Sequence, residues 1–371
     1  MVQSMDTLST RRLNRATLDR QMLLERQRLG LVAAVDTLIG LQGQVSEGPY
    51  QGLWSRLEGF RHEELTALRG DRTLVRATSL RSTLHLHTVD DLLGLRPHVQ
   101  PTLDRMWQSA FGNRRFGDND VAAVHKAGVR LLDKGPMTGG ALGKALQARF
   151  PDGEPLAKSV LLQVKEILIQ IPPTRLWGSG HAPILTRAQN WLPKPHKRPL
   201  KLDELVLRYL RAYGPASVLD MQSWSGIGKL APVFAKLGDE LQTYAGEDGR
   251  VLYDLADATL PDADVEAPVR FLPDYDNAIL GYERRERIAG ADDQRRLVAL
   301  TRSFRGVLVD GFVAGAWSIA RRKGDATLTV VPFRRLLKRE QRAMEQEGEA
   351  FLRFMNKDAE RREVVFAPVP D

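Results

Sequence analysis

Two glutamines, Gln42 and Gln44, flank Gly43 at the end of an apolar stretch with helical spacing. A neutral amide both donates and accepts hydrogen bonds, so such a pair can hold a water molecule and the polar edge of a base without supplying a charge. The sequence offers no obvious rival centre, because it has no cysteine nucleophile and no metal-ligating cluster. The pair suits chemistry on a leaving group that is already activated.

The composition predicts a soluble protein of several domains with a polyanionic partner. The chain has 371 residues, of which 43% are hydrophobic, enough for about two to four domains with packed cores. Lys and Arg number 54 against 46 Asp and Glu, a formal net charge of +8 that favours partners such as nucleic acid. The lack of cysteine excludes disulfides, thiol catalysis and cysteine-bound metals.

The amino-terminal residues predict neither export nor membrane insertion. Residues 1–12 lack an apolar segment of signal-peptide length, and no later apolar run approaches the length of a membrane span. We therefore expect a cytoplasmic protein without a membrane partner.

The elements around the glutamines are typical of a winged helix. Residues 17–41 carry apolar positions at helical spacing and predict one or two helices that end at the Gln-Gly-Gln step. Short helices are predicted over 50–57 and 62–68, and residues 73–87 alternate apolar and polar residues as in a β-hairpin. Helices followed by a hairpin predict a first winged-helix unit over residues 10–96.

The same order of elements recurs twice. After a predicted linker through Pro97 and Pro101, helices and a strand pair predict a second winged-helix unit over 97–195. A basic, proline-rich linker at 193–199 leads into a third unit over 196–260, which ends in a hairpin with a glycine-containing turn. The three passes share little sequence identity, so the repeat is one of element order.

The last part of the chain, residues 261–371, predicts a small β-rich, barrel-like domain. Asp310 and Gly311 form a strong hairpin-turn signal between two apolar runs. The other predicted elements are strands at 269–273, 306–319 and 326–332 and a closing helix over 335–356. The predicted fold class is therefore α+β.

Five motifs, in order along nearly the whole chain, carry a family resemblance. They are the Gln42-Gly43-Gln44 step, residues 81–85 (RSTLH), 224–226 (WSG), 272–276 (LPDYD) with 280–282 (LGY), and 309–317 (VDGFVAGAW). With these motifs the sequence resembles the AlkZ/YcaQ-like winged-helix DNA glycosylases. One such motif would be weak, but five in sequence are fairly specific.

The resemblance implies three tandem winged helices and a β-barrel domain arranged as a C-shaped, DNA-binding cleft. Members of the family remove N7-alkylated purines, and some unhook interstrand crosslinks. A Gln-hydrophobic-Gln signature marks the branch associated with self-resistance to DNA-alkylating natural products, and Gln42 and Gln44 match it. Gly43 departs from the hydrophobic central residue. The expected partner is double-stranded DNA carrying alkylated purines, bound by a monomer, because a cleft built from one chain needs no second copy.

The expected reaction explains why glutamines would suffice. Hydrolysis of an N-glycosidic bond builds positive charge on the sugar. An N7-alkylated guanine is already cationic and leaves as a neutral base, so the remaining tasks are to position water and to stabilise the sugar electrostatically. We expect Gln42 and Gln44 to be the catalytic residues of a monofunctional glycosylase, with their carbonyl oxygens facing the developing cation. No cofactor or metal is expected, because amides are not preferred ligands of magnesium or zinc.

Less specialised explanations exist for these residues. Without the accompanying motifs, two glutamines after a helix are most often ordinary surface residues. Asp36 is the nearest upstream carboxylate, but a helical spacing of six does not place it beside Gln42. Glu47 lies closer, on a loop of Gly and Pro. Both carboxylates rank below the glutamines as catalytic candidates.

The hairpin and the basic linker supply the predicted DNA contacts. A wing of this kind touches phosphates or a groove, and basic linker residues give salt-sensitive, sequence-independent affinity. The predicted contact residues are Arg76, Arg81, Ser82, Thr83, His85, Lys197 and Arg198. An exposed strand face explains His87 better than a DNA contact, and His85 is compatible with either role.

The main alternative function is a tandem winged-helix transcription regulator without catalysis. The predicted helix segments at 161–168 and 230–237 each hold a single lysine, which argues against readout of the major groove. A metal-dependent nuclease would need a carboxylate cluster that the sequence lacks. For a glycosylase that acts on bulky adducts, we expect an open cleft with little of the usual base flipping.

Overall fold

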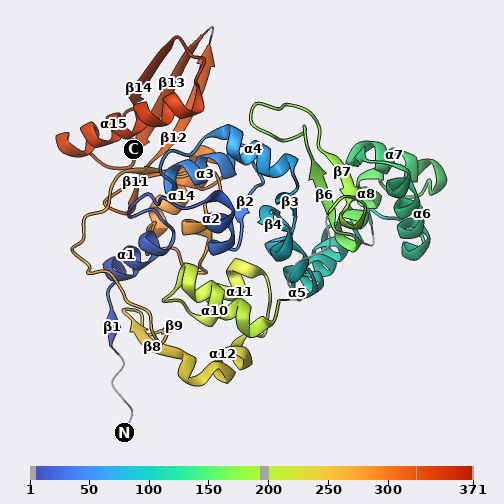
Figure 1. Ribbon diagram of the computed structural model, residues 1–371, viewed down its shortest axis with the longest axis horizontal. Coiled ribbons are helices and arrows are strands. Elements are labelled where there is room, and N and C mark those ends of the chain that lie inside the picture. Colours follow the sequence, from blue (N-terminus) through green and yellow to red (C-terminus); the bar gives the residue numbers. More distant parts are fainter. Residues whose placement is uncertain (1–5, 113, 193–199, 323, 370–371) are drawn as a thin grey trace.

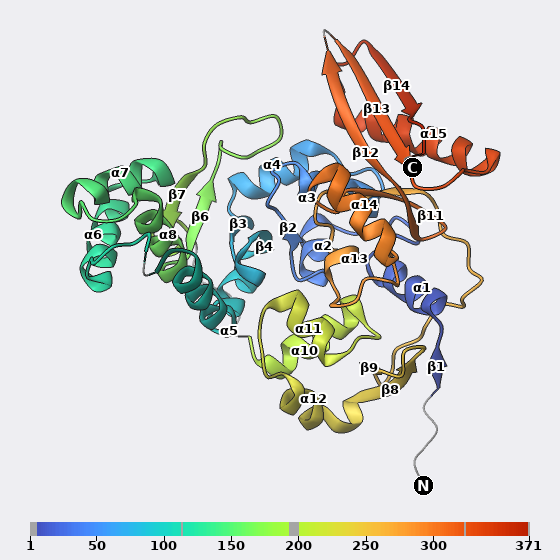
Figure 2. The same cartoon turned by 180° about the vertical axis from the view of Figure 1, so that it is seen from behind.

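The computed structural model describes residues 6–112, 114–192, 200–322 and 324–369. Within them the strands gather into three sheets of six, five and three strands, with helices around them, which confirms the α+β class. Figures 1 and 2 show the helices of residues 121–165 at one end and the sheet of residues 306–366 at the other, with the glutamine region between them. Among these residues no helix is long and apolar enough to span a membrane.

Residues 6–88 form helices around a β-hairpin. The hairpin pairs its strands antiparallel from Leu74 opposite Thr88 to Thr78 opposite Leu84, so the predicted hairpin is confirmed. The elements are β1 (Thr7–Leu8), α1 (Thr10–Arg20), α2 (Leu31–Thr37), β2 (Leu41–Gln42), α3 (Gly48–Arg56), α4 (His62–Gly70), β3 (Leu74–Thr78), a 3-10 turn (Leu80–Ser82) and β4 (Leu84–Thr88).

The helix before the glutamines ends earlier than its apolar spacing predicts. Helix α2 stops at Thr37, and Gln42 lies on strand β2 instead of at a helix end. Ile39 and Gly40 have φ values of 56° and 97°, in the left-handed region that breaks a helix. A Cβ on Gly40 would lie 2.4 Å from Nδ1 of His87. Glycine therefore allows the turn that brings β2 against β4.

A single helix, α5 (Val89–Trp107), replaces the linker predicted through Pro97 and Pro101. Proline removes one helical hydrogen bond and usually breaks a helix. Here the apolar face of α5 is buried, with Leu95 and Leu103 in the largest core cluster, and burial of this kind offsets the lost bonds. The predicted boundary between residues 96 and 97 thus falls inside a continuous helix.

The middle of the chain forms two helical groups close to the predicted positions. The predicted strand pair of the second group and hairpin of the third are both present. The elements after α5 are a π-helix (Gln108–Gly112), α6 (Val121–Lys134), β5 (Met137–Thr138), α7 (Gly139–Arg149), α8 (Pro155–Lys165), β6 (Leu168–Ile171), β7 (Ile184–Arg187), α9 (Ala188–Trp191), α10 (Leu202–Tyr213), α11 (Val218–Ser225), α12 (Ala231–Leu237), a 3-10 turn (Gly238–Glu240), β8 (Leu241–Gly246) and β9 (Val251–Leu255).

Two of the sheets join segments that lie far apart in the sequence. The six-stranded sheet has the order β2-β4-β3-β6-β7-β5, and β3 meets β6 through the pairs Arg76–Gln170 and Ala77–Ile169. The three-stranded sheet places β1 parallel to β8. The strands of the predicted first and second units therefore form one sheet.

The carboxy-terminal sheet is open, so the prediction of a barrel is wrong. Its order is β10-β11-β12-β13-β14, and no pairing between β10 and β14 closes it in the described part of the chain. Strand β14 adds parallel to β13, and buried Phe351 and Leu352 of α15 cover the sheet. The elements are β10 (Arg270–Phe271), α13 (Asn277–Leu280), α14 (Ala291–Thr301), β11 (Gly306–Val309), β12 (Phe312–Arg322), β13 (Asp325–Pro332), α15 (Lys338–Met355) and β14 (Arg361–Phe366).

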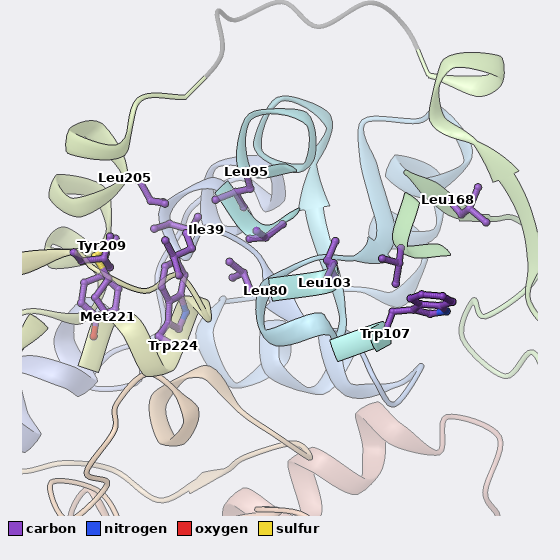
Figure 3. Packing of buried hydrophobic residues seen from close by; sticks show 14 of the residues in the cluster. Ile39, Leu80, Leu95, Leu103, Trp107, Leu168, Leu205, Tyr209, Met221 and Trp224 are labelled. Carbon is purple, nitrogen blue, oxygen red and sulfur yellow. The ribbon is translucent and has the colours of Figure 1, made fainter. Parts of the chain in front are cut away.

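The largest hydrophobic cluster includes a residue of the turn between β3 and β4, which packs there against residues of α5 and α11. Leu80, in the turn between β3 and β4, belongs to the same cluster as Leu103, Trp107 and Trp224 (Figure 3). A hairpin turn that projects into solvent would leave this leucine exposed, but only 1% of its surface is accessible. Leu80 therefore anchors the turn of the first hairpin in the core.

Candidate functional site

Gln42 is held in place at the edge of the six-stranded sheet. It lies opposite His85 on β4, and only 7% of its surface is exposed. Its side-chain oxygen Oε1 accepts a hydrogen bond of 2.7 Å from the backbone N–H of Gln44. The carbonyl end of the Gln42 amide is therefore engaged within the motif.

Gln44 is exposed and completes a link to the start of β4. Its side-chain oxygen accepts a hydrogen bond from the backbone N–H of Leu84, at 3.3 Å. The N–H of Gly43 donates to the carbonyl of the same Leu84, at 2.7 Å. Each glutamine carbonyl thus already accepts one bond from the protein, and both amide NH₂ groups lack a hydrogen-bond partner among the described residues.

The surroundings of Gly43 leave room for a Cβ atom, so they do not require a glycine. A Cβ at this position would lie 3.4 Å from Nε of Arg76 and 3.6 Å from the backbone of Leu84 and His85, and its φ is outside the left-handed region that favours glycine. A small side chain fits there at ordinary contact distance. The departure from the family signature therefore leaves the backbone in a conformation that other residues also adopt.

The buried side chain of Arg76 holds the backbone of the glutamine motif in place. Its guanidinium donates from Nε to the Gly43 carbonyl at 2.8 Å and from Nη2 to the Gly43 and Gln44 carbonyls, while Nη1 donates to Oε1 of Gln170. The side chain is 3% exposed. Burial, with smaller contributions from Arg69 and Arg175, lowers the pKa of Arg76 to about 9.

The contacts of Arg76 differ from those expected of a phosphate-binding wing residue. Its guanidinium bonds only neutral oxygens, and no ion pair to it is present in the described part of the chain. These contacts favour a structural role over a direct one, and its predicted contact with DNA stays a prediction. Sequence reasoning also missed Gln170, whose only signal is a polar residue between Ile169 and Ile171 in a buried strand.

Residues 81–84 of the hairpin are half-buried, and His85 is buried. Arg81 and Ser82 have φ values of 52° and 61°, and the Arg81 guanidinium donates to the Trp224 carbonyl. Nδ1 of His85 lies 3.1 Å from the Thr83 carbonyl, so it carries the proton, and Nε2 faces Nη2 of Arg81 at 3.5 Å. Burial, with the nearby charge of Arg81, lowers the pKa of His85 well below its usual value. His85 is a neutral hydrogen-bond relay here.

His87 is buried, so the expectation of an exposed strand face is wrong. None of its surface is accessible, and burial lowers its pKa to about 4, against a smaller opposing effect of Asp91. The reason is topological. Strand β4 lies between β2 and β3, and both α2 and α5 contact it.

The remaining candidates lie elsewhere or outside the described residues. Lys197 and Arg198 fall in the segment 193–199, which is not described. Asp36 forms an ion pair with Arg208, 3.4 Å apart, and the described residues contain no group of three metal-ligating side chains. A hollow of about 940 Å³ lies between α4, Trp177 and the β12–β13 hairpin, and neither glutamine lines it.

Comparison with known proteins identifies the family and a similar fold. A family model for AlkZ-like DNA glycosylases matches residues 35–354. The structure is similar to that of Streptomyces sahachiroi DNA glycosylase AlkZ, with a TM-score of 0.74 and 24% identity over 97% of this chain and 100% of that chain. No match was found among curated proteins. Because the family model spans most of the chain, this protein belongs to the AlkZ-like DNA glycosylase family.

Proposed function

We propose that this DNA glycosylase hydrolyses the N-glycosidic bond of N7-alkylated, cationic purines in double-stranded DNA, with Gln42 and Gln44 as its catalytic residues. The observation that carries the proposal is the neutrality of the motif. Each amide is fixed by backbone N–H groups, and no carboxylate bonds either side chain in the described part of the chain. A site without a positioned acid suits a base that needs no protonation in order to leave.

The exposure of Gln44 supports a site that admits bulky lesions. Gln44 and Val45 are both exposed, while Gln42 is nearly buried beneath them. A motif at the surface can approach an adduct from a groove without drawing the base into a closed pocket. On this ground we extend the proposal to the unhooking of interstrand crosslinks. The match of Gln42 and Gln44 to the Gln-hydrophobic-Gln branch extends it to self-resistance against a DNA-alkylating natural product.

The arrangement of the chain on DNA is part of the same proposal. Three winged-helix units over 10–96, 97–195 and 196–260, with the domain of 261–371, would form a C-shaped cleft around the duplex and act as a monomer. The element order of helices followed by paired strands in each region supports the three units.

The test is a duplex that carries a single N7-methylguanine, incubated with the purified protein and then treated with alkali to cleave abasic sites. We expect Gln42→Ala and Gln44→Ala each to lower the single-turnover excision rate by about 10²-fold, with DNA affinity nearly unchanged. Gln341→Ala, on the exposed face of α15, is the matched control. Absence of strand breaks above background with the wild-type protein would instead favour the transcription regulator.

A further inference from the structure

The orientation of the Gln42 amide is fixed by its partner. The two ends of a carboxamide have nearly the same shape, but the backbone N–H of Gln44 can only donate. The atom that it meets at 2.7 Å must therefore be the oxygen of Gln42. The other end of the amide is then the NH₂ group. It has no hydrogen-bond partner among the described residues and is not one of the side-chain atoms sealed from solvent.

A chain of hydrogen bonds strengthens this NH₂ group as a donor. The Arg76 guanidinium donates to the carbonyl of Gly43, and the same peptide unit carries the N–H of Gln44 that donates to Oε1 of Gln42. Hydrogen bonds in series polarise one another, most of all where water is excluded. The buried positive charge of Arg76 thus draws electron density from the Gln42 amide through one peptide group.

We propose that Gln42 acts as a hydrogen-bond donor to the departing purine, and does not serve as an acceptor that orients water. The inference rests on the proposed function and assigns a chemical role within it. The matching acceptors on an N7-alkylated guanine are its ring nitrogen N3 and its oxygen O6, to which an uncharged donor would bond without repelling the cationic base.

The donor would act where electron density accumulates. The C1′–N9 bond breaks with its electron pair remaining on N9, which cancels the positive charge of the alkylated ring. Water forms the new bond to C1′ and releases a proton to solvent. As the bond breaks, N3 and O6 become stronger acceptors, so a donor that touches them stabilises the transition state more than the ground state. Gln44, exposed beside it, is left to contact the water.

The decisive variants change the donor and preserve the shape. In Gln42→Glu, one oxygen keeps the bond from the Gln44 N–H and the other replaces the NH₂ group by an acceptor. At pH 8, with the carboxyl ionised, we expect single-turnover excision of N7-methylguanine to fall by about 10²-fold. As the pH is lowered toward 5 the carboxyl gains a proton and becomes a donor, and we expect at least about a tenfold recovery. Gln42→Met should lose a similar factor at every pH.

Controls measured over the same pH range account for the other groups that titrate near the site. Among the described residues, the charged or titratable groups near Gln42 include Arg76, which bonds the Gly43 carbonyl, His85 opposite Gln42 on β4, and Glu47 before α3. All three are present in the wild type and in Gln44→Glu, which are followed over the same pH range as controls. Acid recovery confined to Gln42→Glu supports the donor.

Three results would overturn the inference. They are a Gln42→Glu variant that excises at or above the wild-type rate at pH 8, a Gln42→Glu variant without acid recovery, and a Gln42→Met variant that retains the rate. DNA binding by each variant shows that it is folded, and Gln42→Met decides the question if the glutamate variant does not fold. Failure of the proposed function is a different outcome, because the wild-type protein would then excise nothing.

Discussion

Replacing Arg76 by methionine separates a role in holding the motif from a role in holding DNA. Burial and neighbouring charges lower the pKa of Arg76 from its ordinary value to about 9, which corresponds to about 5 kcal/mol against the charged form. Its bonds to the carbonyls of Gly43 and Gln44 and to Oε1 of Gln170 contribute about 1.5–3 kcal/mol each. The two effects nearly cancel, so Arg76→Met should lower the free energy of unfolding by only about 2 kcal/mol.

The effect of Arg76→Met on excision should be much larger. Without the guanidinium, the Gly43–Gln44 peptide group is no longer held, and misplacement by about 1 Å can cost about 10²-fold in rate. Urea unfolding gives the stability, single-turnover excision of N7-methylguanine gives the rate, and titration of the same duplex gives the affinity, with exposed Arg61→Met as the control. We expect affinity to change by less than about threefold, because the side chain is buried. A variant that loses affinity but keeps its rate at saturation would refute this reasoning and restore Arg76 as a phosphate contact.

Three further substitutions test the neighbouring backbone and the buried histidine. Gly43→Ala should leave the excision rate within about twofold and stability within about 1 kcal/mol, as measured by the same assays, and a large loss of rate would show that the motif needs a glycine. Gly40→Ala should destabilise the protein by more than about 1 kcal/mol, because its Cβ would meet His87 Nδ1 at 2.4 Å and its φ is 97°; thermal unfolding near the wild-type temperature would contradict this. The pKa of His87 is lowered from 6.5 to about 4, so the unfolded chain takes up the proton first and stability falls by about 3 kcal/mol as the pH drops from 6.5 to 4. His87→Gln should remove that part of the slope in urea unfolding, and an unchanged slope would place the proton uptake elsewhere.

Local pattern predicted the elements well where periodicity and turn chemistry agreed. The hairpin of 73–87 forms where the alternation of apolar and polar residues predicts it, and the turn at Asp310 and Gly311 has φ values of 47° and 83°, as its sequence predicts. The pattern failed where tertiary packing outweighed a local signal. Pro97 and Pro101 lie within a helix because its apolar face is buried, and the apolar spacing before Gln42 runs on past the turn at Gly40.

The position of the candidate site stays a prediction, and the sequence does not indicate the direction of its side chains. The motif identifies Gln42 and Gln44, yet no spacing indicates that the carbonyl of one closes onto the backbone of the other. Arginine on a hairpin is as compatible with a phosphate as with the inside of a sheet. The role of Arg76 depends on strand β6, which follows it by about ninety residues and which only the folded chain brings alongside. A contact between residues so far apart in the sequence produces no local sequence pattern that could predict it.

The short pairing of β3 with β6 has a consequence for engineering. Arg76 faces Gln170 across this pairing, and the same arginine holds the glutamine motif. The two segments are therefore not exchangeable parts. A chimera that takes residues 97–195 from a relative would replace Gln170, the partner of Arg76 on β6. Such a chimera could fold and bind DNA and still excise slowly. Transplanting the substrate range of another member would require β3, β6 and the Gln42-Gly43-Gln44 step to move as one block.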